Sequence, residues 1–217
     1  MDFEDGLVNY EAFGAQGDGV TDDMPAICEA HAYANAHGLS VRTKPDATYH
    51  LGYRALTAVI ATDTDWNTSR FTIDDSDLDR VEDHRAALFE VRSLLEPENI
   101  RIDRLTRDQK QVDTRPERDC FVLVENENKR LYIRRGLNQN KGSVQHDVFI
   151  LRRDGCIDSP IDWDYDEITR IEARPIDEKP LVIRGGVFTT FANRMKQEQG
   201  YNYWSRNIAI SRSNTEV

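Results

Sequence analysis

The clearest structural signal in the sequence is the stretch Tyr10-Glu11-Ala12-Phe13-Gly14-Ala15-Gln16-Gly17-Asp18-Gly19-Val20-Thr21-Asp22-Asp23. Its three glycines mark a turn, because glycine adopts backbone conformations that other residues avoid. The aspartates at its end suit the positive end of a helix dipole, with Thr21 or Asp22 as the capping residue. The stretch therefore predicts a glycine-rich turn that leads directly into a helix.

The residues that follow continue the helical pattern as far as Gly38. Pro25 is tolerated in a first helical turn, and Gly38 is a typical C-terminal stop. A narrow apolar stripe recurs at helical spacing and consists mostly of small side chains: Ala26, Ile27, Ala30 and Ala34. A stripe of alanines allows a helix to lie close to a flat surface. We expect this helix to pack over the end or side of a β structure.

From Leu39 onward the sequence consists of short runs rich in β-branched and aromatic residues, bounded by Gly, Pro, Asp or Asn. The expected strands are Ser40–Arg42, Thr48–Leu51, Thr57–Ala61, Arg70–Ile73, Ala87–Val91, Asn99–Ile102, Cys120–Val124, Leu131–Arg134, Val148–Leu151, Thr169–Ala173, Leu181–Ile183, Val187–Thr190 and Asn207–Ile210. So many short strands with almost no helix between them indicate an all-β fold. Their uneven connections favour a solenoid slightly over a sandwich, although no strict repeat period is visible.

Charge and composition exclude several classes of partner. The 217 residues carry a formal net charge of −11, which repels phosphate backbones and anionic membranes, so we expect no nucleic-acid and no membrane partner. No apolar run approaches the roughly 20 residues that a membrane span needs. The glycines at 14, 17 and 19 superficially resemble a phosphate cradle, but Asp18, Asp22 and Asp23 would repel the anion.

The order Phe13-Gly14-Ala15-x-Gly17-Asp18-Gly19-x-Thr21-Asp22-Asp23, followed by an alanine-rich helix and Gly38, resembles the N-terminal signature of the pectate-lyase superfamily. Val41, Pro45, Thr48 and Tyr49 extend the resemblance, while Asp46-Ala47 stands where the family usually has a glycine. The match covers roughly the first 52 residues, with weaker rung-like patterns at 183–188 and 206–210. The family comprises right-handed parallel β-helices, among them polygalacturonase-like hydrolases, polysaccharide lyases and tailspike-like proteins.

The resemblance implies a single right-handed parallel β-helix domain over residues 1–217, with 1–52 as an N-terminal capping helix and first rung. The 14–19 turn and the helix would then cover the open first rung, which makes the motif structural rather than catalytic. Because relatives are commonly longer, the chain is expected to be shortened at its C-terminal end. Family membership also implies an extracellular location, although the acidic N-terminus has no signal-peptide profile.

The implied function is action on an acidic or complex polysaccharide, as a glycoside hydrolase more than as a lyase. The alternative is a non-catalytic carbohydrate-binding or structural module, such as a tailspike-like or adhesion segment, which would form stable homo-oligomers. An enzyme would cluster carboxylates along the side groove of the helix, whereas a structural module would disperse them.

The acidic and aromatic stretch 158–167 is the most suggestive candidate site. Paired carboxylates perform acid and base work in glycosidases, and aromatic rings stack on sugar faces. The catalytic candidates are therefore Asp162, Asp164 and Asp166, and the substrate-binding candidates are Trp163 and Tyr165. The alternative is an exposed turn region in which Trp163 and Tyr165 pack locally.

No cofactor and no metal site is expected from the spacing of potential ligands. Asp74, Asp75, Asp77 and Asp79 imitate the start of a calcium loop, but neither the glycine nor the glutamate that such a loop needs follows them. The histidines and the three cysteines are scattered and match no metal-ligand spacing. A solvated acidic loop is the simpler interpretation.

Overall fold

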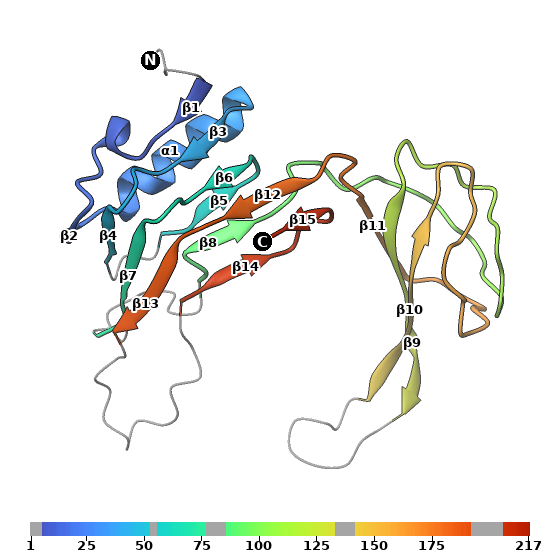
Figure 1. Cartoon of the computed structure of the whole chain (residues 1–217). Coiled ribbons are helices and arrows are strands. Elements are labelled where there is room, and N and C mark those ends of the chain that lie inside the picture. The colour runs from blue at the N-terminus through green and yellow to red at the C-terminus, as the bar shows by residue number, and fades with distance from the viewer. Residues whose placement is uncertain (1–5, 53–55, 77–85, 133–141, 192–205) are drawn as a thin grey trace, which may run out of the picture. The chain divides into compact units, whose positions relative to one another are not determined.

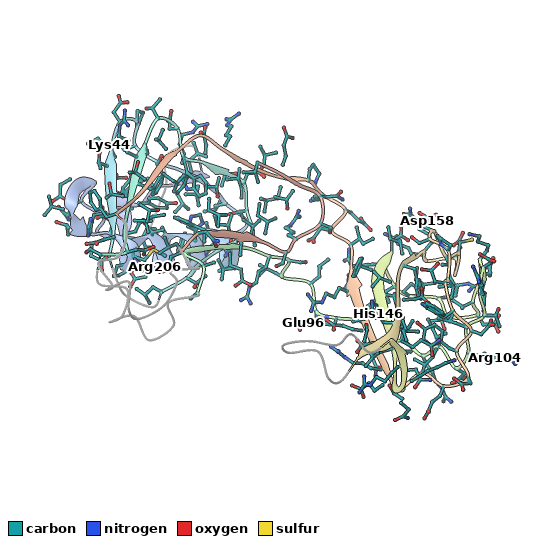
Figure 2. All side chains as sticks on the ribbon, turned by 90° about the horizontal axis from the view of Figure 1, so that it is seen from below. Lys44, Glu96, Arg104, His146, Asp158 and Arg206 are labelled. Atoms are coloured by element: carbon teal, nitrogen blue, oxygen red, sulfur yellow. The ribbon has the colours of Figure 1, made fainter. Side chains whose placement is uncertain are left out.

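The computed structural model describes residues 6–52, 56–76, 86–132, 142–191 and 206–217. Two compact units make up the chain: the first spans Met1–Leu94 and Glu178–Val217, and the second spans Leu95–Asp177. The second unit is thus inserted in the sequence of the first. Figure 2 shows Arg206 within the first unit and Arg104, His146 and Asp158 within the second.

The first unit begins with the glycine-rich turn and its helix. A short 3-10 helix, η2 (Glu11–Phe13), precedes the turn, and α1 (Met24–His37) follows it. The Asp23 carboxylate folds back to accept the Gln16 and Gly17 N–H groups at 2.6 and 3.2 Å, so it holds the turn together. The N-cap position is Asp23 and not Thr21 or Asp22, while Gly38 ends the helix in the left-handed conformation, as predicted.

Three parallel sheets form the rest of the first unit. Its strands are β1 (Leu7–Val8), β2 (Asp18–Asp22), β3 (Ser40–Arg42), β4 (Thr48–Leu51), β5 (Ala58–Ile60), β6 (Thr64–Asp65), β7 (Arg70–Asp74), β8 (Phe89–Val91), β12 (Leu181–Arg184), β13 (Val187–Phe191), β14 (Ile208–Ile210) and β15 (Thr215–Glu216). Sheet A has the order β1-β3-β6-β12-β15, sheet B the order β13-β7-β4-β2, and sheet C the order β14-β8-β5.

The chain passes through these sheets in a repeating order. It visits sheets A, B and C in the succession β3-β4-β5, then β6-β7-β8, and then β12-β13-β14. Every pairing between these strands is parallel, and Val41, Thr64 and Ile183 share one register position across sheet A. Figure 1 shows β12 beside β6, although the whole second unit separates the two strands in sequence.

Aromatic side chains from successive strands fill the interior of the first unit. Tyr49, Phe71 and Phe188 occupy one register position across sheet B. The ring centroids of Tyr49 and Phe71 lie 5.3 Å apart, and those of Phe71 and Phe188 lie 4.7 Å apart. Trp66 packs edge-on against Phe71 and Phe188. The predicted alanine stripe of α1 packs into the same core, because Ala26, Ile27, Ala30 and Ala34 are all buried.

The second unit is an antiparallel sheet with its own core. It contains β9 (Cys120–Tyr132), β10 (Ser143–Leu151) and β11 (Arg170–Pro175), in the order β10-β9-β11. Both strand pairings are antiparallel. One face of the sheet carries Val122, Val124, Phe149, Leu151 and Ala173, and the connecting loops cover it with Leu105, Ile161 and Tyr165.

The predicted all-β character is confirmed, with one helix, whereas the right-handed parallel β-helix stays a prediction, and residues 120–175 do not fit it. A solenoid is built from parallel strands, whereas residues 120–175 pair antiparallel. Asn99–Ile102, predicted as a strand, forms no strand, and the neighbouring Glu98 makes only an isolated bridge to Ala173. The expectation of one domain over 1–217 stays a prediction. Each of the two units has its own cluster of buried apolar residues. In the part of the chain that the structure describes, no helix is long and apolar enough to cross a membrane.

Candidate functional site

The acidic and aromatic stretch predicted from the sequence forms a loop between β10 and β11 of the second unit. Asp162, Asp164 and Asp166 are exposed on this loop, and Trp163 is 42% exposed. Tyr165 is only 1% exposed and belongs to the core, with its N–H donating to the Leu105 carbonyl at 2.9 Å. Trp163 is therefore available for contact with a ligand, whereas the ring of Tyr165 packs locally.

Two of the three candidate aspartates hold the loop in place. Asp164 accepts the Arg107 N–H at 2.9 Å, and Asp166 accepts the side-chain amide of Asn126 at 3.2 Å. The Asp162 carboxylate has no hydrogen bond or ion pair with any described residue. Asp162 is thus the candidate whose carboxylate remains accessible for chemistry or binding.

Two buried polar residues of β10 lie beneath this loop. Asp147, 6% exposed, accepts the Asp162 N–H at 3.1 Å, and Gln145, fully buried, donates its amide to the Asp164 carbonyl at 3.0 Å. Burial raises the pKa of the Asp147 carboxyl, and the nearby negative charge of Asp162 acts in the same direction. The sequence analysis did not single out either residue, although both occupy the inward-facing alternate positions that continue to Phe149 and Leu151.

A hollow of about 290 Å³ lies along sheet A in the first unit. Its lining residues come from four strands and the segment before β6: Leu7, Ser40, Val41, Arg42, Asp63, Thr64, Asp65, Val182 and Arg184. We call it the sheet A hollow. The strands are parallel and in register, so their outward side chains form rows that run across the sheet. No residue of this hollow was predicted as a site residue from the sequence.

A row of alternating charges crosses the sheet A hollow. Arg42, Asp65 and Arg184 share one register position on β3, β6 and β12. The Asp65 carboxylate lies 3.4 Å from the Arg42 guanidinium and 3.0 Å from that of Arg184, and the side chains of the two arginines are 48% and 65% exposed. Each arginine has five N–H donors, so both retain donors that face solvent.

The Asp65 carboxylate of the hollow is held in its ionised form, in which it accepts hydrogen bonds. Burial of Asp65 opposes its ionisation, but the Asn67 N–H and the Arg184 guanidinium outweigh it and hold its pKa below the usual value. Asp63 accepts the Val182 N–H at 2.9 Å. A general acid needs a raised pKa, so Asp65 is unsuited to that role.

The calcium loop considered from the sequence lies partly outside the described residues, which exclude Asp77 and Asp79. Asp74 accepts the Ser76 N–H at 3.0 Å, and Asp75 is buried in an ion pair with Arg206. Among the described residues, no group of three or more His, Cys, Asp or Glu side chains is arranged to hold a metal ion.

The fold resembles that of a phage tailspike. The solved structure is the tailspike gp61 of Pseudomonas phage phi297, with a TM-score of 0.52 and 13% sequence identity. The similarity covers 88% of this chain and 35% of the tailspike chain, so the protein spans about a third of the length of that neighbour. No family model matches the sequence, and no curated protein matches it. At this level of identity the similarity concerns the fold alone.

Proposed function

We propose that the first unit is a section of a right-handed parallel β-helix and that it binds polysaccharide in the sheet A hollow, as part of a tailspike-like protein. Three observations support the fold assignment: the repeated passage through sheets A, B and C, the parallel pairing throughout, and the resemblance to a tailspike. The N-terminal signature of the pectate-lyase superfamily agrees with it. An outer face built from rows of in-register side chains suits a polymer with a repeating unit.

The row Arg42–Asp65–Arg184 is the observation that carries the binding proposal. Two exposed arginines share the Asp65 carboxylate, and with Asp63 the lining of the hollow carries two positive and two negative side chains, whereas the whole protein has a net charge of −11. Exposed guanidinium donors bind carboxylates in well-defined geometry. Ser40 and Asp63 add a hydroxyl and a carboxylate that can bond sugar hydroxyls. The expected ligand is therefore a polysaccharide that contains acidic sugars.

The proposal favours binding over cleavage at this hollow, because the pKa of Asp65 is lowered. Binding of the purified protein to immobilised acidic and neutral polysaccharides, measured by biolayer interferometry, tests it. Arg184→Ala is expected to weaken acidic-polysaccharide binding about 10- to 100-fold, since a hydrogen bond to a charged group contributes roughly 1.5–3 kcal/mol. Arg101→Ala, an exposed arginine of the second unit, is the matched control and should bind as the wild type does.

Two experimental outcomes would contradict binding without cleavage. Release of reducing sugar from any bound polysaccharide would favour the hydrolase or lyase alternative, and the acidic candidates Asp162, Asp164 and Asp166 would then be replaced by Asn one at a time. Absence of binding to every polysaccharide in a panel, by protein that is folded according to circular dichroism, would reject the carbohydrate-binding function.

A structural, oligomer-forming module is the second candidate. Val187 and Phe191 of β13 and Ile210 of β14 are 49%, 55% and 50% exposed. β13 and β14 are the edge strands of sheets B and C, and exposed large apolar side chains on edge strands are typical of surfaces that contact other protein. Light scattering coupled to size exclusion tests this candidate, because a monodisperse homo-oligomer would favour it and a monomer at all concentrations would exclude it for this chain.

A further inference from the structure

Two buried polar side chains of β10 anchor the loop 158–167 in the second unit. Gln145 is fully buried and Asp147 is 6% exposed. The Asp147 carboxylate accepts the Asp162 N–H at 3.1 Å and also interacts with the Trp163 N–H. Gln145 donates its side-chain amide at 3.0 Å to the carbonyl of the residue after Trp163. These contacts fix the backbone on both sides of Trp163.

A neighbouring segment holds the same loop along its other edge. Residues 105–108 run antiparallel to residues 161–165. Two backbone hydrogen bonds of 2.9 Å join the segments, from the Tyr165 N–H to the Leu105 carbonyl and from the Asp108 N–H to the Ile161 carbonyl. Because residues directly opposite in an antiparallel pair lie close together, this order places Arg107 across from the bend at Asp162 and Trp163.

Three side chains project from this anchored bend. Arg107 and Asp162 are exposed, and Trp163 is 42% exposed, whereas the flanking Ile161 and Tyr165 belong to the core. Among the described residues, the side chains of Arg107 and Asp162 have no hydrogen bond and no ion pair. A surface whose backbone is already fixed loses little conformational entropy when a ligand binds, so it favours recognition.

We propose that Trp163, Asp162 and Arg107 form a binding site for an uncharged hexose unit of a polysaccharide. The apolar C–H face of a hexose can stack on the indole of Trp163. Sugar hydroxyls both donate and accept hydrogen bonds, which suits a carboxylate that only accepts beside a guanidinium that only donates. The two opposite charges offset each other, so the site matches a ligand without net charge.

An acidic sugar does not fit this site as well as a neutral one. The same loop carries four further acids, which repel an anion: Asp158, Asp164, Asp166 and Glu167. The expected ligand therefore differs in charge from the acidic polysaccharide proposed for the sheet A hollow. All residues of the site belong to the second unit, so the proposal does not rest on binding in that hollow.

Binding of the full chain to an immobilised neutral glucan, mannan and galactan, measured by biolayer interferometry, tests the proposal. We expect saturable binding to at least one of the three. Trp163→Ala should weaken that binding about 10-fold or more, because it removes the apolar surface that covers the sugar face. Trp163→Phe keeps an aromatic ring and should lose less. Asp162→Ala should weaken binding about 10-fold, since it removes a charged hydrogen-bond acceptor.

Phe121→Ala is the matched control. Phe121 is an aromatic residue of the same unit, 48% exposed, and it alternates on β9 with the core residue Val122, so it lies on the opposite face of the sheet. This variant should bind the neutral polymer as the wild type does. An excess of soluble acidic polysaccharide should not displace the protein from the neutral polymer. The proposal is overturned if none of the three polymers is bound, if Trp163→Ala binds as tightly as Phe121→Ala, or if the acidic polymer displaces the neutral one.

Discussion

The buried guanidinium of Arg206 donates through Nε to the Asp75 carboxylate at 2.8 Å, across 131 residues of sequence. Both side chains are almost fully buried, at 1% and 3% exposed. Arg206 also donates to the carbonyls of Gly52 and Asp74 at 2.7 and 2.8 Å. This one side chain joins the ends of β4 and β7 to the residue two positions before β14. Arg206 therefore connects the segment that precedes β14 of sheet C to the C-terminal ends of two strands of sheet B.

Asp75→Asn is expected to destabilise the first unit by about 3–5 kcal/mol, because it leaves the Arg206 charge buried without its counter-charge. Urea unfolding followed by circular dichroism measures the change. Asp65→Asn is the control: it breaks ion pairs with two exposed arginines, and such surface pairs contribute only about 0–1 kcal/mol. If Asp75→Asn lowered the free energy of unfolding by less than Asp65→Asn does, the buried Arg206 charge would not depend on its ion pair with Asp75.

The turn between β12 and β13 depends on a glycine at position 185. Gly185 has a φ of 79°, and a Cβ atom there would lie 2.4 Å from the Asn67 carbonyl oxygen on the neighbouring turn. Gly38 has a similar φ of 63°, but a Cβ atom there would meet nothing within 4 Å. Gly185→Ala should therefore lower the free energy of unfolding clearly more than Gly38→Ala does. The effect of Gly38→Ala is limited to the roughly 1–2 kcal/mol that a non-glycine residue loses in the left-handed conformation.

Thermal unfolding of the two glycine variants provides the comparison. For Gly185→Ala we expect a loss beyond about 3 kcal/mol, since the backbone strain and the contact with Asn67 add. Equal melting temperatures for the two variants would mean that the neighbouring turns move apart freely, which would contradict their close packing.

The glycine-rich turn at the start of the chain should depend on Asp23 more than on any other acid of α1. Asp23→Ala removes the acceptor of the Gln16 and Gly17 N–H groups, and a typical hydrogen bond contributes about 0.5–1.5 kcal/mol to stability. Glu29→Ala, an exposed acid on the same helix, is the control and should change stability little. The expected result is a lower urea midpoint for Asp23→Ala alone.

Most local elements of the first unit could be predicted from the sequence, because the signals for them lie within a few consecutive residues. The turn glycines, the alanine stripe and the β-branched runs are local signals, and the strands at Ser40, Thr48, Arg70 and Leu181 begin at the residues expected. The sequence did not distinguish the antiparallel strands of the second unit from the parallel strands of the first, because the same residue types form both. Only the pairing differs, and pairing is decided by contacts between distant residues.

The candidate sites differ in how far local sequence could reveal them. The acidic loop is continuous in sequence and was found, and polar Gln145 and Asp147 at inward positions of an alternating strand were a visible but unused signal. The row of Arg42, Asp65 and Arg184 could not be found in this way. Arg184 lies 119 residues from Asp65, and only the strand register brings the two together.

The buried histidine of α1 makes the stability of the first unit depend on pH. His31 Nε2 lies 2.8 Å from the Tyr10 hydroxyl, which itself accepts the Trp66 indole N–H at 3.0 Å. The Tyr10 hydroxyl can donate its one proton to Nε2 of His31 only while that ring nitrogen is unprotonated. Burial lowers the pKa of His31 to about 3, against the usual value of 6.5.

Below pH 6.5 the unfolded chain binds a proton at His31 that the folded chain excludes until about pH 3. The free energy of unfolding should fall by about 1.4 kcal/mol per pH unit in this window, or by about 2 kcal/mol between pH 6.5 and pH 5. His31→Gln keeps a hydrogen-bonding side chain that does not titrate, so urea unfolding at pH 7, 6 and 5 should show a smaller slope. His37→Gln, an exposed histidine of the same helix, should keep the wild-type slope. Equal slopes for wild type and His31→Gln would mean that His31 takes up its proton within the folded core.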